Sequence, residues 1–235
     1  MGKTEEKMGK VDGKLVVIAG IDGSGKTIQT ELLSARLLDK GRDVVTMSFP
    51  QYGKTFFADM VTRYLHGDFG SSSEVSPYLA SLLYAGDRWE VREQIRTWLK
   101  EGRIIVSNRY VADNEAHQGG KIKNQTERKG FLEWLNVLEY EVFGLPKADI
   151  NIFLHIPVEI ACQLIKKKDK RAYLAGGKKD IHEDNIEHLK QAQEVYLEIA
   201  SMENDWAIIN GVRNGVLLPA EDISDMVWEV IEKIL

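Results

Sequence analysis

Short, continuously apolar runs alternate with longer amphipathic stretches along this chain of 235 residues. We expect strands at the five apolar runs, residues 15–19, 44–49, 104–107, 150–155 and 206–210. The stretches between them carry apolar residues at helical spacing. Helices are therefore predicted over residues 27–39, 56–65, 77–100, 127–143, 158–168, 185–202 and 222–235. Apolar strands separated by helices are typical of a parallel sheet covered on both faces, so the pattern predicts a three-layer α/β fold.

The first predicted helix follows a glycine-rich turn. Its apolar residues Ile28, Leu32, Ala35 and Leu38 recur at helical spacing, and Gly41 stands where a C-terminal cap is expected. No repeat with a period of 20–50 residues is present, and the Gly/Ser-rich stretch at 67–73 is only loop-sized. We therefore predict a single domain over residues 14–235, preceded by a disordered tail at 1–13.

Composition narrows the class of protein. Hydrophobic residues make up 43% and charged residues 29% of the chain, an ordinary globular mixture. No apolar run approaches the roughly 18 residues of a membrane span. The single cysteine, Cys162, excludes a disulfide framework and a multi-cysteine zinc site. The polar first 14 residues do not resemble a signal peptide, so we expect a cytoplasmic protein without a membrane partner.

The charge is unevenly distributed. The net charge of −5 argues against nucleic acid as a partner. Residues 166–179, however, contain six lysines and Arg171 against one acidic residue, Asp169. Such a basic segment in an acidic protein indicates an anionic ligand, although a merely solvated charged run would have the same composition.

Residues 20–27 read G-I-D-G-S-G-K-T and fit the pattern G-x-x-x-x-G-K-[ST]. In such a loop, backbone N–H groups and a helix N-terminus bind phosphate, the lysine reaches the β- and γ-phosphates, and the final hydroxyl holds Mg²⁺. The ATP-binding residues that this pattern predicts are Gly20, Ile21, Asp22, Gly23, Ser24, Gly25, Lys26 and Thr27. Because the loop lies between a predicted strand and a predicted helix, we interpret it as a nucleoside triphosphate site.

No N-K-x-D motif of a GTPase switch is present. A phosphate loop combined with a basic segment favours a phosphotransferase that closes over two anionic substrates, since closure excludes water.

Four further motifs carry a family resemblance. They are S-F-P-Q-Y at 48–52, L-L-Y-A-G-D-R-W-E at 82–90, S-N-R-Y at 107–110 and H-Q-G-G at 117–120. Together with the phosphate loop, and in the same order over residues 15–235, they resemble the thymidylate kinase family. The resemblance implies a P-loop NTPase fold with a five-stranded parallel sheet and a short basic lid. It also implies transfer of the ATP γ-phosphoryl to dTMP with Mg²⁺, and a homodimer.

The resemblance also implies roles for residues on the acceptor side. Arg88 and Arg109 would hold the acceptor phosphate, and Tyr84 would stack on the thymine ring. Asp22 would accept a hydrogen bond from the 3′-hydroxyl of the sugar. The other acceptor-binding residues implied are Phe49, Pro50, Tyr52, Asn114, His117 and Gln118. Without the resemblance, Arg88 would be read as a solvated charge, Tyr84 and Phe49 as core residues, and His117 as structural.

Catalysis is expected from Lys26, Arg109 and a lid cation. The lid is placed at about 166–183, and Arg171 is the predicted cation because a planar guanidinium grips phosphate better than an ammonium; Lys168 and Lys170 are the alternatives. The family's D-R-Y motif reads Asn108-Arg109-Tyr110 here. Asn108 can ligate a metal but brings no charge, so Thr27 is the predicted Mg²⁺ ligand and Asn108 a second candidate.

Three other functions stay open at this stage. The chain could phosphorylate another nucleoside monophosphate, or use polyphosphate as the donor in a kinase of similar design. From a different class, it could be a nucleotide-binding module that has lost catalysis, a hypothesis that Asn108 keeps open.

Overall fold

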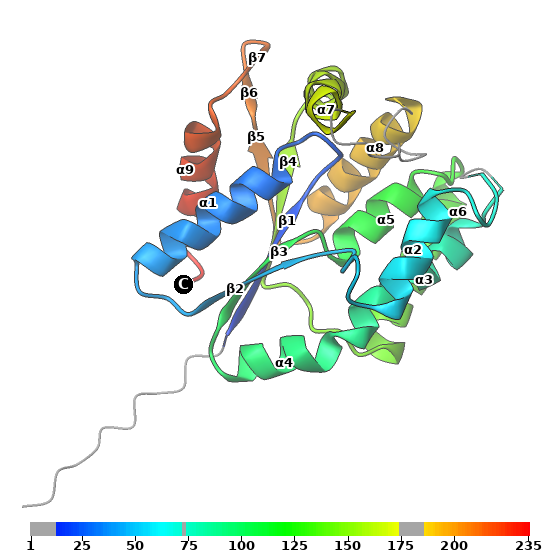
Figure 1. Cartoon of the computed structure of the whole chain (residues 1–235), viewed down its shortest axis with the longest axis horizontal. Helices are drawn as coiled ribbons and strands as arrows, with labels where there is room; N and C mark the ends of the chain where they lie inside the picture. Colours follow the sequence, from blue (N-terminus) through cyan, green and yellow to red (C-terminus); the bar gives the residue numbers. More distant parts are fainter. Residues whose placement is uncertain (1–12, 72–73, 174–185) are drawn as a thin grey trace, which may run out of the picture.

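The computed structural model describes residues 13–71, 74–173 and 186–235, and of residues 168–173 only the backbone. At its centre lies a five-stranded sheet in the order β2-β3-β1-β4-β5 (Figure 1). Its strands are β1 (Lys14–Ala19), β2 (Val44–Ser48), β3 (Ile104–Asn108), β4 (Ile150–His155) and β5 (Trp206–Asn210). Each neighbouring pair in this sheet is parallel, which confirms the predicted fold class.

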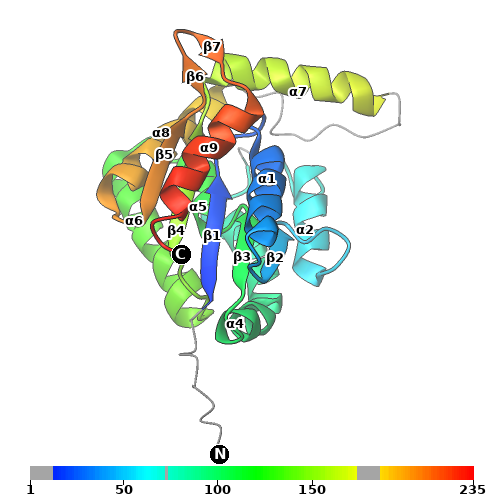
Figure 2. The same cartoon turned by 90° about the vertical axis from the view of Figure 1, so that its left-hand side faces the viewer.

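The two faces of β1 belong to different parts of the core. Val16 and Ile18 pack with buried residues of α1 (Lys26–Asp39) and α9 (Ala220–Ile231). Leu15 and Val17 pack with buried residues of α5 (Val111–Gly119) and α8 (Ile186–Met202). Figures 1 and 2 show these helix layers on opposite sides of the sheet. The alternation follows from the period of two in a strand.

Six further helical segments complete the described fold. They are α2 (Phe56–Leu65), α3 (Pro77–Glu90), α4 (Arg92–Lys100), α6 (Gln125–Asn136), η1 (Val137–Val142) and α7 (Val158–Tyr173). The single helix predicted over 77–100 was wrong, because the chain leaves helical geometry at Val91 (φ −106°, ψ 5°). The helix predicted over 127–143 ends at Asn136 and continues as the π-helical turn η1.

One helix and one hairpin of two strands were not predicted. Helix α5 is buried along almost its whole length and carries polar residues on its buried sides, so it shows no apolar periodicity. Strands β6 (Val212–Arg213) and β7 (Val216–Leu217) form a two-stranded hairpin around Asn214 and Gly215, both with positive φ.

The apolar face expected for the first helix was also wrong. In α1, Ile28 and Leu38 are exposed, whereas Leu33, Leu37 and Ser34 are buried. The face of α1 that carries Leu33 and Leu37 packs against the sheet and α9. The polar residue Gln29 lies on the same face, and its amide donates to the carbonyl of Ala220 at 2.8 Å.

The ends of the described ranges bear on two predictions. The disordered tail predicted for residues 1–13 lies outside the described residues except for Gly13, which belongs to the fold and donates its N–H to the carbonyl of Leu99. The part of the predicted lid (166–183) that follows Tyr173 also lies outside the described residues. Within the described residues, no helix is both long enough and apolar enough to cross a membrane.

Candidate active site

The loop between β1 and α1 holds the G-I-D-G-S-G-K-T motif. Gly25 precedes α1 with φ of 89°, in the left-handed region that glycine adopts without strain. At Gly23 a Cβ would lie 2.4 Å from the carbonyl oxygen of Ala161, so the loop lies directly against α7. The buried Lys26 donates from Nζ to the carbonyls of Gly20 (2.7 Å) and Ile21 (2.9 Å). The ammonium is thus held inside a loop whose form suits phosphate oxygens.

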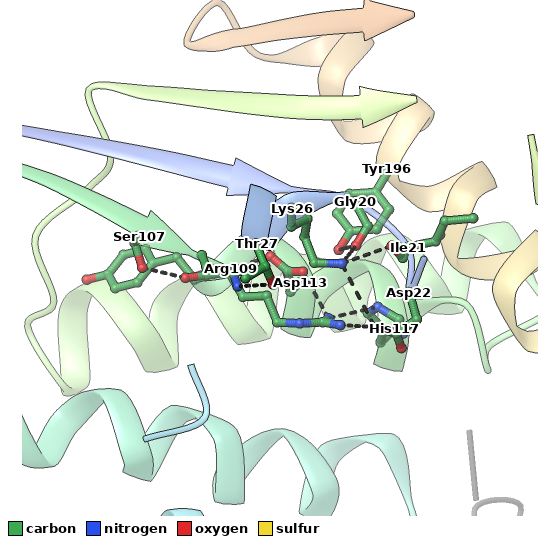
Figure 3. A network of polar contacts seen from close by, with 12 residues as sticks. Gly20, Ile21, Asp22, Lys26, Thr27, Ser107, Arg109, Asp113, His117 and Tyr196 are labelled. Atoms are coloured by element: carbon green, nitrogen blue, oxygen red, sulfur yellow. Dashed lines mark hydrogen bonds and ion pairs between the residues drawn. The ribbon is translucent and has the colours of Figure 1, made fainter. Parts of the chain in front are cut away.

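Arg109 connects this loop to α5. It follows β3 with φ of 70°, and its N–H donates to the carbonyl of Ile18 at 3.0 Å. Its guanidinium donates from Nη2 to Oδ1 of Asp22 in the loop, and from Nη1 to Oδ1 of Asp113 at 3.1 Å (Figure 3). The structure therefore brings Asp22, Lys26 and Arg109, three of the predicted site residues, into one network.

Opposite charges in this network stabilise one another. Burial would raise the pKa of Asp22, but Arg109 and Lys26 outweigh it and lower that pKa well below its usual range. Burial would lower the pKa of Arg109, but Asp22 and Asp113 raise it. Asp22 is consequently a carboxylate at neutral pH and can accept a hydrogen bond from a hydroxyl, as predicted for this position.

Two histidines extend the network. Nε2 of His117 lies 3.3 Å from Nη1 of Arg109, and its Nδ1 lies 3.1 Å from Nε2 of His188. Burial, helped by the charge of Arg109, lowers the pKa of His117 well below its usual value, and burial lowers that of His188 to about 4. Both rings are therefore neutral at pH 7. Since arginine only donates, Nε2 of His117 accepts and its Nδ1–H donates to His188.

Asn108 and Thr27 meet beside the phosphate loop. Nδ2 of Asn108 donates to Oγ1 of Thr27 at 3.3 Å. Oδ1 of Asn108 is buried and has no hydrogen-bond partner among the described residues. No group of three His, Cys, Asp or Glu side chains in the described part of the chain could hold a metal ion. Mg²⁺ usually takes few protein ligands in addition to substrate phosphates and water. Oγ1 of Thr27 and Oδ1 of Asn108 are therefore suitable ligands for it.

The segment after β2 carries three of the predicted acceptor residues. Phe49 is buried against Tyr110, with ring centroids 5.8 Å apart, whereas Tyr52 is exposed. Asp87 of α3 orders this segment, since its carboxylate accepts from Oγ1 of Thr55 and, at 2.9 Å, from the N–H of Gln51. Pro50, joined to Phe49 by a cis peptide bond, lies between these contacts. Phe49 is thus part of the core, and the acceptor-binding roles of Pro50 and Tyr52 stay predictions.

A second cluster gathers between α3, α5 and η1. Arg88 donates from Nε to Oε2 of Glu139 at 3.0 Å and from Nη2 to Oε1 of the same carboxylate. Asn114 donates from Nδ2 to that oxygen at 3.1 Å. Arg88 is therefore buried in an ion pair and is not the solvated helix charge that was the alternative. Its Nη1 also donates to the carbonyl of Tyr110, the residue after Arg109, at 3.4 Å. The joint binding of the acceptor phosphate by Arg88 and Arg109 stays a prediction.

The remaining predicted residues occupy different settings. Tyr84 is half-buried, and its ring packs edge-on against Tyr64 with centroids 6.3 Å apart. Gln118 is buried, and its Oε1 lacks a partner among the described residues. The backbone of Arg171 lies in α7, but its side chain is outside the described residues, as are those of Lys168 and Lys170. The lid cation therefore stays a prediction.

Sequence reasoning did not assign several residues of the site: Asp113, Glu139, His188 and Tyr196. The spacing of four residues between Arg109 and Asp113 could have indicated their contact, because residues four apart lie on one side of a helix. Tyr196 hydrogen-bonds the carbonyl of Gly20 at 3.3 Å and packs against Phe153. His188 and Glu139 are 71 and 51 residues distant from their partners His117 and Arg88, and no local pattern indicates such contacts.

The fold and the phosphate loop define a P-loop nucleotide-binding protein. The family profile described as Thymidylate kinase matches residues 18–223. The chain is 30% identical to a Mycobacterium tuberculosis thymidylate kinase over 80% of this chain and 86% of that protein. It is also 30% identical to a probable thymidylate kinase of Thermococcus onnurineus, over 92% and 96% of the two chains. The chain belongs to the thymidylate kinase family.

A solved structure supports the fold independently. The structure of a Candida albicans thymidylate kinase superposes with a TM-score of 0.72, covering 94% of this chain and 92% of that one at 24% identity.

Proposed function

We propose that this protein transfers the γ-phosphoryl group of ATP to dTMP and so forms dTDP and ADP. Membership of the thymidylate kinase family supports the reaction. The observation that carries the assignment is the Arg109 network, in which one guanidinium lies between Asp22 of the phosphate loop and Asp113 of α5. The phosphate loop and the proposed acceptor cation are therefore in direct contact, so two nucleotides bound to them would lie side by side, which favours in-line transfer.

Three residues of the network position the two substrates and stabilise part of their charge. An acceptor phosphate displaces carboxylates from Arg109, whose planar fork suits phosphate oxygens. Asp22, released from the ion pair, accepts from the sugar hydroxyl. Lys26 exchanges its bonds to backbone carbonyls for the β- and γ-phosphates. Because a phosphate oxygen is already nucleophilic, no general base is needed.

Two further groups complete the proposal. Mg²⁺ would be held by Thr27 and Asn108, beside ATP, and when bound it would neutralise charge on the phosphates. Arg171 of the lid would stabilise the transferring phosphoryl. We also propose a homodimer and a cytoplasmic location. The family resemblance supports the first and the single cysteine suits the second.

A coupled assay of ADP release tests the reaction. The acceptor panel is dTMP, dUMP, dCMP and dGMP with a blank without acceptor, each with ATP·Mg²⁺. Strong turnover with dTMP is expected. Turnover with another monophosphate but not with dTMP would mean that this other nucleotide is the acceptor. A parallel reaction with polyphosphate in place of ATP, measured as dTDP formation, would show a different donor if it alone gave product. ATP binding without turnover would favour a non-catalytic module.

A further inference from the structure

A buried histidine of α8 contacts the network around Arg109 through His117. Nε2 of His188 lies 3.1 Å from Nδ1 of His117 on α5, a residue 71 positions away in the chain. The ring centroids of the two histidines are 5.3 Å apart, and Tyr196 packs edge-on against His117 with centroids 6.2 Å apart. No step of the proposed transfer uses His188, so its place beside the network needs an explanation of its own.

Both ring nitrogens of His117 have a partner. Nη1 of Arg109 lies 3.3 Å from Nε2 of His117 (Figure 3), and because arginine only donates, this Nε2 carries no proton. The proton of the neutral ring is therefore on Nδ1, where Nε2 of His188 accepts it in a hydrogen bond. The partner of one ring nitrogen decides what the other nitrogen can do.

His117 differs from the other side chains on this guanidinium in carrying no charge. The carboxyl groups of Asp22 and Asp113 also accept from Arg109, but as carboxylates they would repel an approaching phosphate. A neutral imidazole does not repel it. His117 can therefore go on accepting from Nη1 while an acceptor phosphate replaces the carboxyl groups, and Arg109 keeps its orientation during the exchange.

A histidine suits position 188 better than a carboxylate would. A carboxylate beside Nδ1 of His117 would favour the imidazolium, whose Nε2–H cannot accept and whose charge repels Arg109. Burial, together with the charge of Lys121, lowers the pKa of His188 to about 4, so this ring is neutral at pH 7. The other titratable groups that face the two rings are those of Asp22, Lys26 and Tyr196.

We propose that His188 is a positioning residue for phosphoryl transfer: it accepts the Nδ1–H of His117 and so holds Nε2 of that ring as the neutral acceptor that orients Arg109. This inference rests on the proposed function, because it assigns Arg109 to the acceptor phosphate. His188 acts through His117 and not on the substrate itself.

NMR of the histidine rings tests the tautomer without any turnover. In the full chain with ¹⁵N-labelled histidines, the ring nitrogen shifts distinguish an Nδ1–H ring, an Nε2–H ring and an imidazolium. The signals of His117 are assigned by their loss in His117→Gln. We expect His117 to be neutral, with its proton on Nδ1, between about pH 6 and pH 8. An Nε2–H ring would overturn the inference.

Two replacements of His188 test its part in the reaction, through kcat/KM for dTMP in the ADP-release assay. His188→Gln supplies a neutral acceptor, Oε1, and should keep kcat/KM within about threefold of the wild type. His188→Leu supplies no acceptor and should lower kcat/KM about tenfold at neutral pH, because the buried N–H of His117 loses its partner.

His188→Glu gives the readout that a purely structural role would not change. Glutamate and glutamine have the same shape, but the carboxylate raises the pKa of His117. The ratio of kcat/KM in this variant to that in the wild type should therefore fall as the pH drops from about 8 to about 6, by up to about tenfold per pH unit. Dividing by the wild type cancels titrations that both proteins share.

A matched control makes the same charge change elsewhere. His66→Glu alters the exposed residue that ends α2, and its ratio to the wild type should not change with pH. Circular dichroism and urea unfolding establish that each variant folds. If His188→Leu or His188→Glu does not fold, the tautomer of His117 in the wild type and in His188→Gln still decides the inference.

Two kinetic results would overturn it. Equal losses in folded His188→Gln and His188→Leu would assign the residue to packing, and a pH-independent ratio for folded His188→Glu would remove the charge argument. A wild type without turnover on dTMP would instead refute the proposed function and the inference with it, whereas an Nε2–H ring in an active enzyme would refute the inference alone.

Discussion

Two arginine–carboxylate pairs in this protein have the same chemistry but differ in how far solvent reaches them. The side chains of Arg88 and Glu139 are 2% and 0% exposed, whereas those of Arg109 and Asp22 are 22% and 26% exposed. Glu139 also accepts a hydrogen bond from a second buried donor, Nδ2 of Asn114. Arg109 instead divides its guanidinium between Asp22 and Asp113 at a place that solvent reaches.

The difference decides what each pair can do. An anion can compete for Arg109, because Asp22, whose side chain is 26% exposed, regains water when it is displaced. Breaking the Arg88 pair would leave an uncompensated charge in the interior, which is far more costly than the pair itself is stabilising. The same two residue types therefore make an exchangeable anion site in one region and a fixed support in the other.

Replacing the buried arginine should give the largest effect on stability. We expect Arg88→Ala to lower the free energy of unfolding by about 3–5 kcal/mol, because Glu139 is left charged without a partner. Urea unfolding followed by circular dichroism measures it. The double variant Arg88→Met/Glu139→Leu should recover most of the loss. A single variant as stable as the wild type would show that the pair is not buried in solution.

Replacing the half-buried Arg109 should instead act on turnover. We expect Arg109→Ala to lower kcat/KM for dTMP about 100- to 1000-fold, the range for losing a group that stabilises transition-state charge. Its free energy of unfolding should change much less than that of Arg88→Ala. The ADP-release assay and urea unfolding measure the two quantities. Full turnover with dTMP would remove Arg109 from the acceptor site.

Glu115 is a buried carboxylate that forms no ion pair with an arginine of the described residues, and it sharpens the comparison. Burial raises the pKa of Glu115 from 4.5 to about 7, although a hydrogen bond from Asn136 opposes it. The folded state therefore holds the proton more tightly, and this group's contribution to stability falls as the pH rises from 4.5 to about 7.

Glu115→Gln removes this titration. We expect the variant to gain stability over the wild type as the pH rises through that window, by up to about 3 kcal/mol above it, since one pKa unit corresponds to about 1.4 kcal/mol. Urea unfolding of both proteins at several pH values measures the difference. A difference that does not change with pH would contradict the raised pKa.

The smallest effect is expected at an exposed pair. Nε of Arg63 lies 3.0 Å from Oδ2 of Asp68, and their side chains are 56% and 45% exposed. We expect Asp68→Asn to change the free energy of unfolding by less than about 1 kcal/mol, because solvent screens such pairs. Thermal unfolding at low and high salt measures it. A loss comparable to that of Arg88→Ala would mean that exposure does not decide the strength of these pairs.

The sequence determined what depends on local order. The bounds predicted for β4, β5 and α2 agree with the structure, because a short apolar run or an amphipathic stretch between breakers sets its own conformation. The phosphate loop is likewise local, since its glycines and lysine act within eight consecutive residues. Asp22, Lys26 and Arg109 were predicted as site residues for the same reason, each in a recognisable motif.

Only the tertiary structure decided the rest. The buried side of α1, the whole of α5 and the partner of Arg88 depend on contacts between segments far apart in the chain. Arg88 and Glu139 are 51 residues apart, and nothing in either segment states which carboxylate will meet which arginine. Arg88 and Arg109 differ because the fold buries them to different degrees. The cost of an unpaired charge depends on its surroundings and not on its residue type.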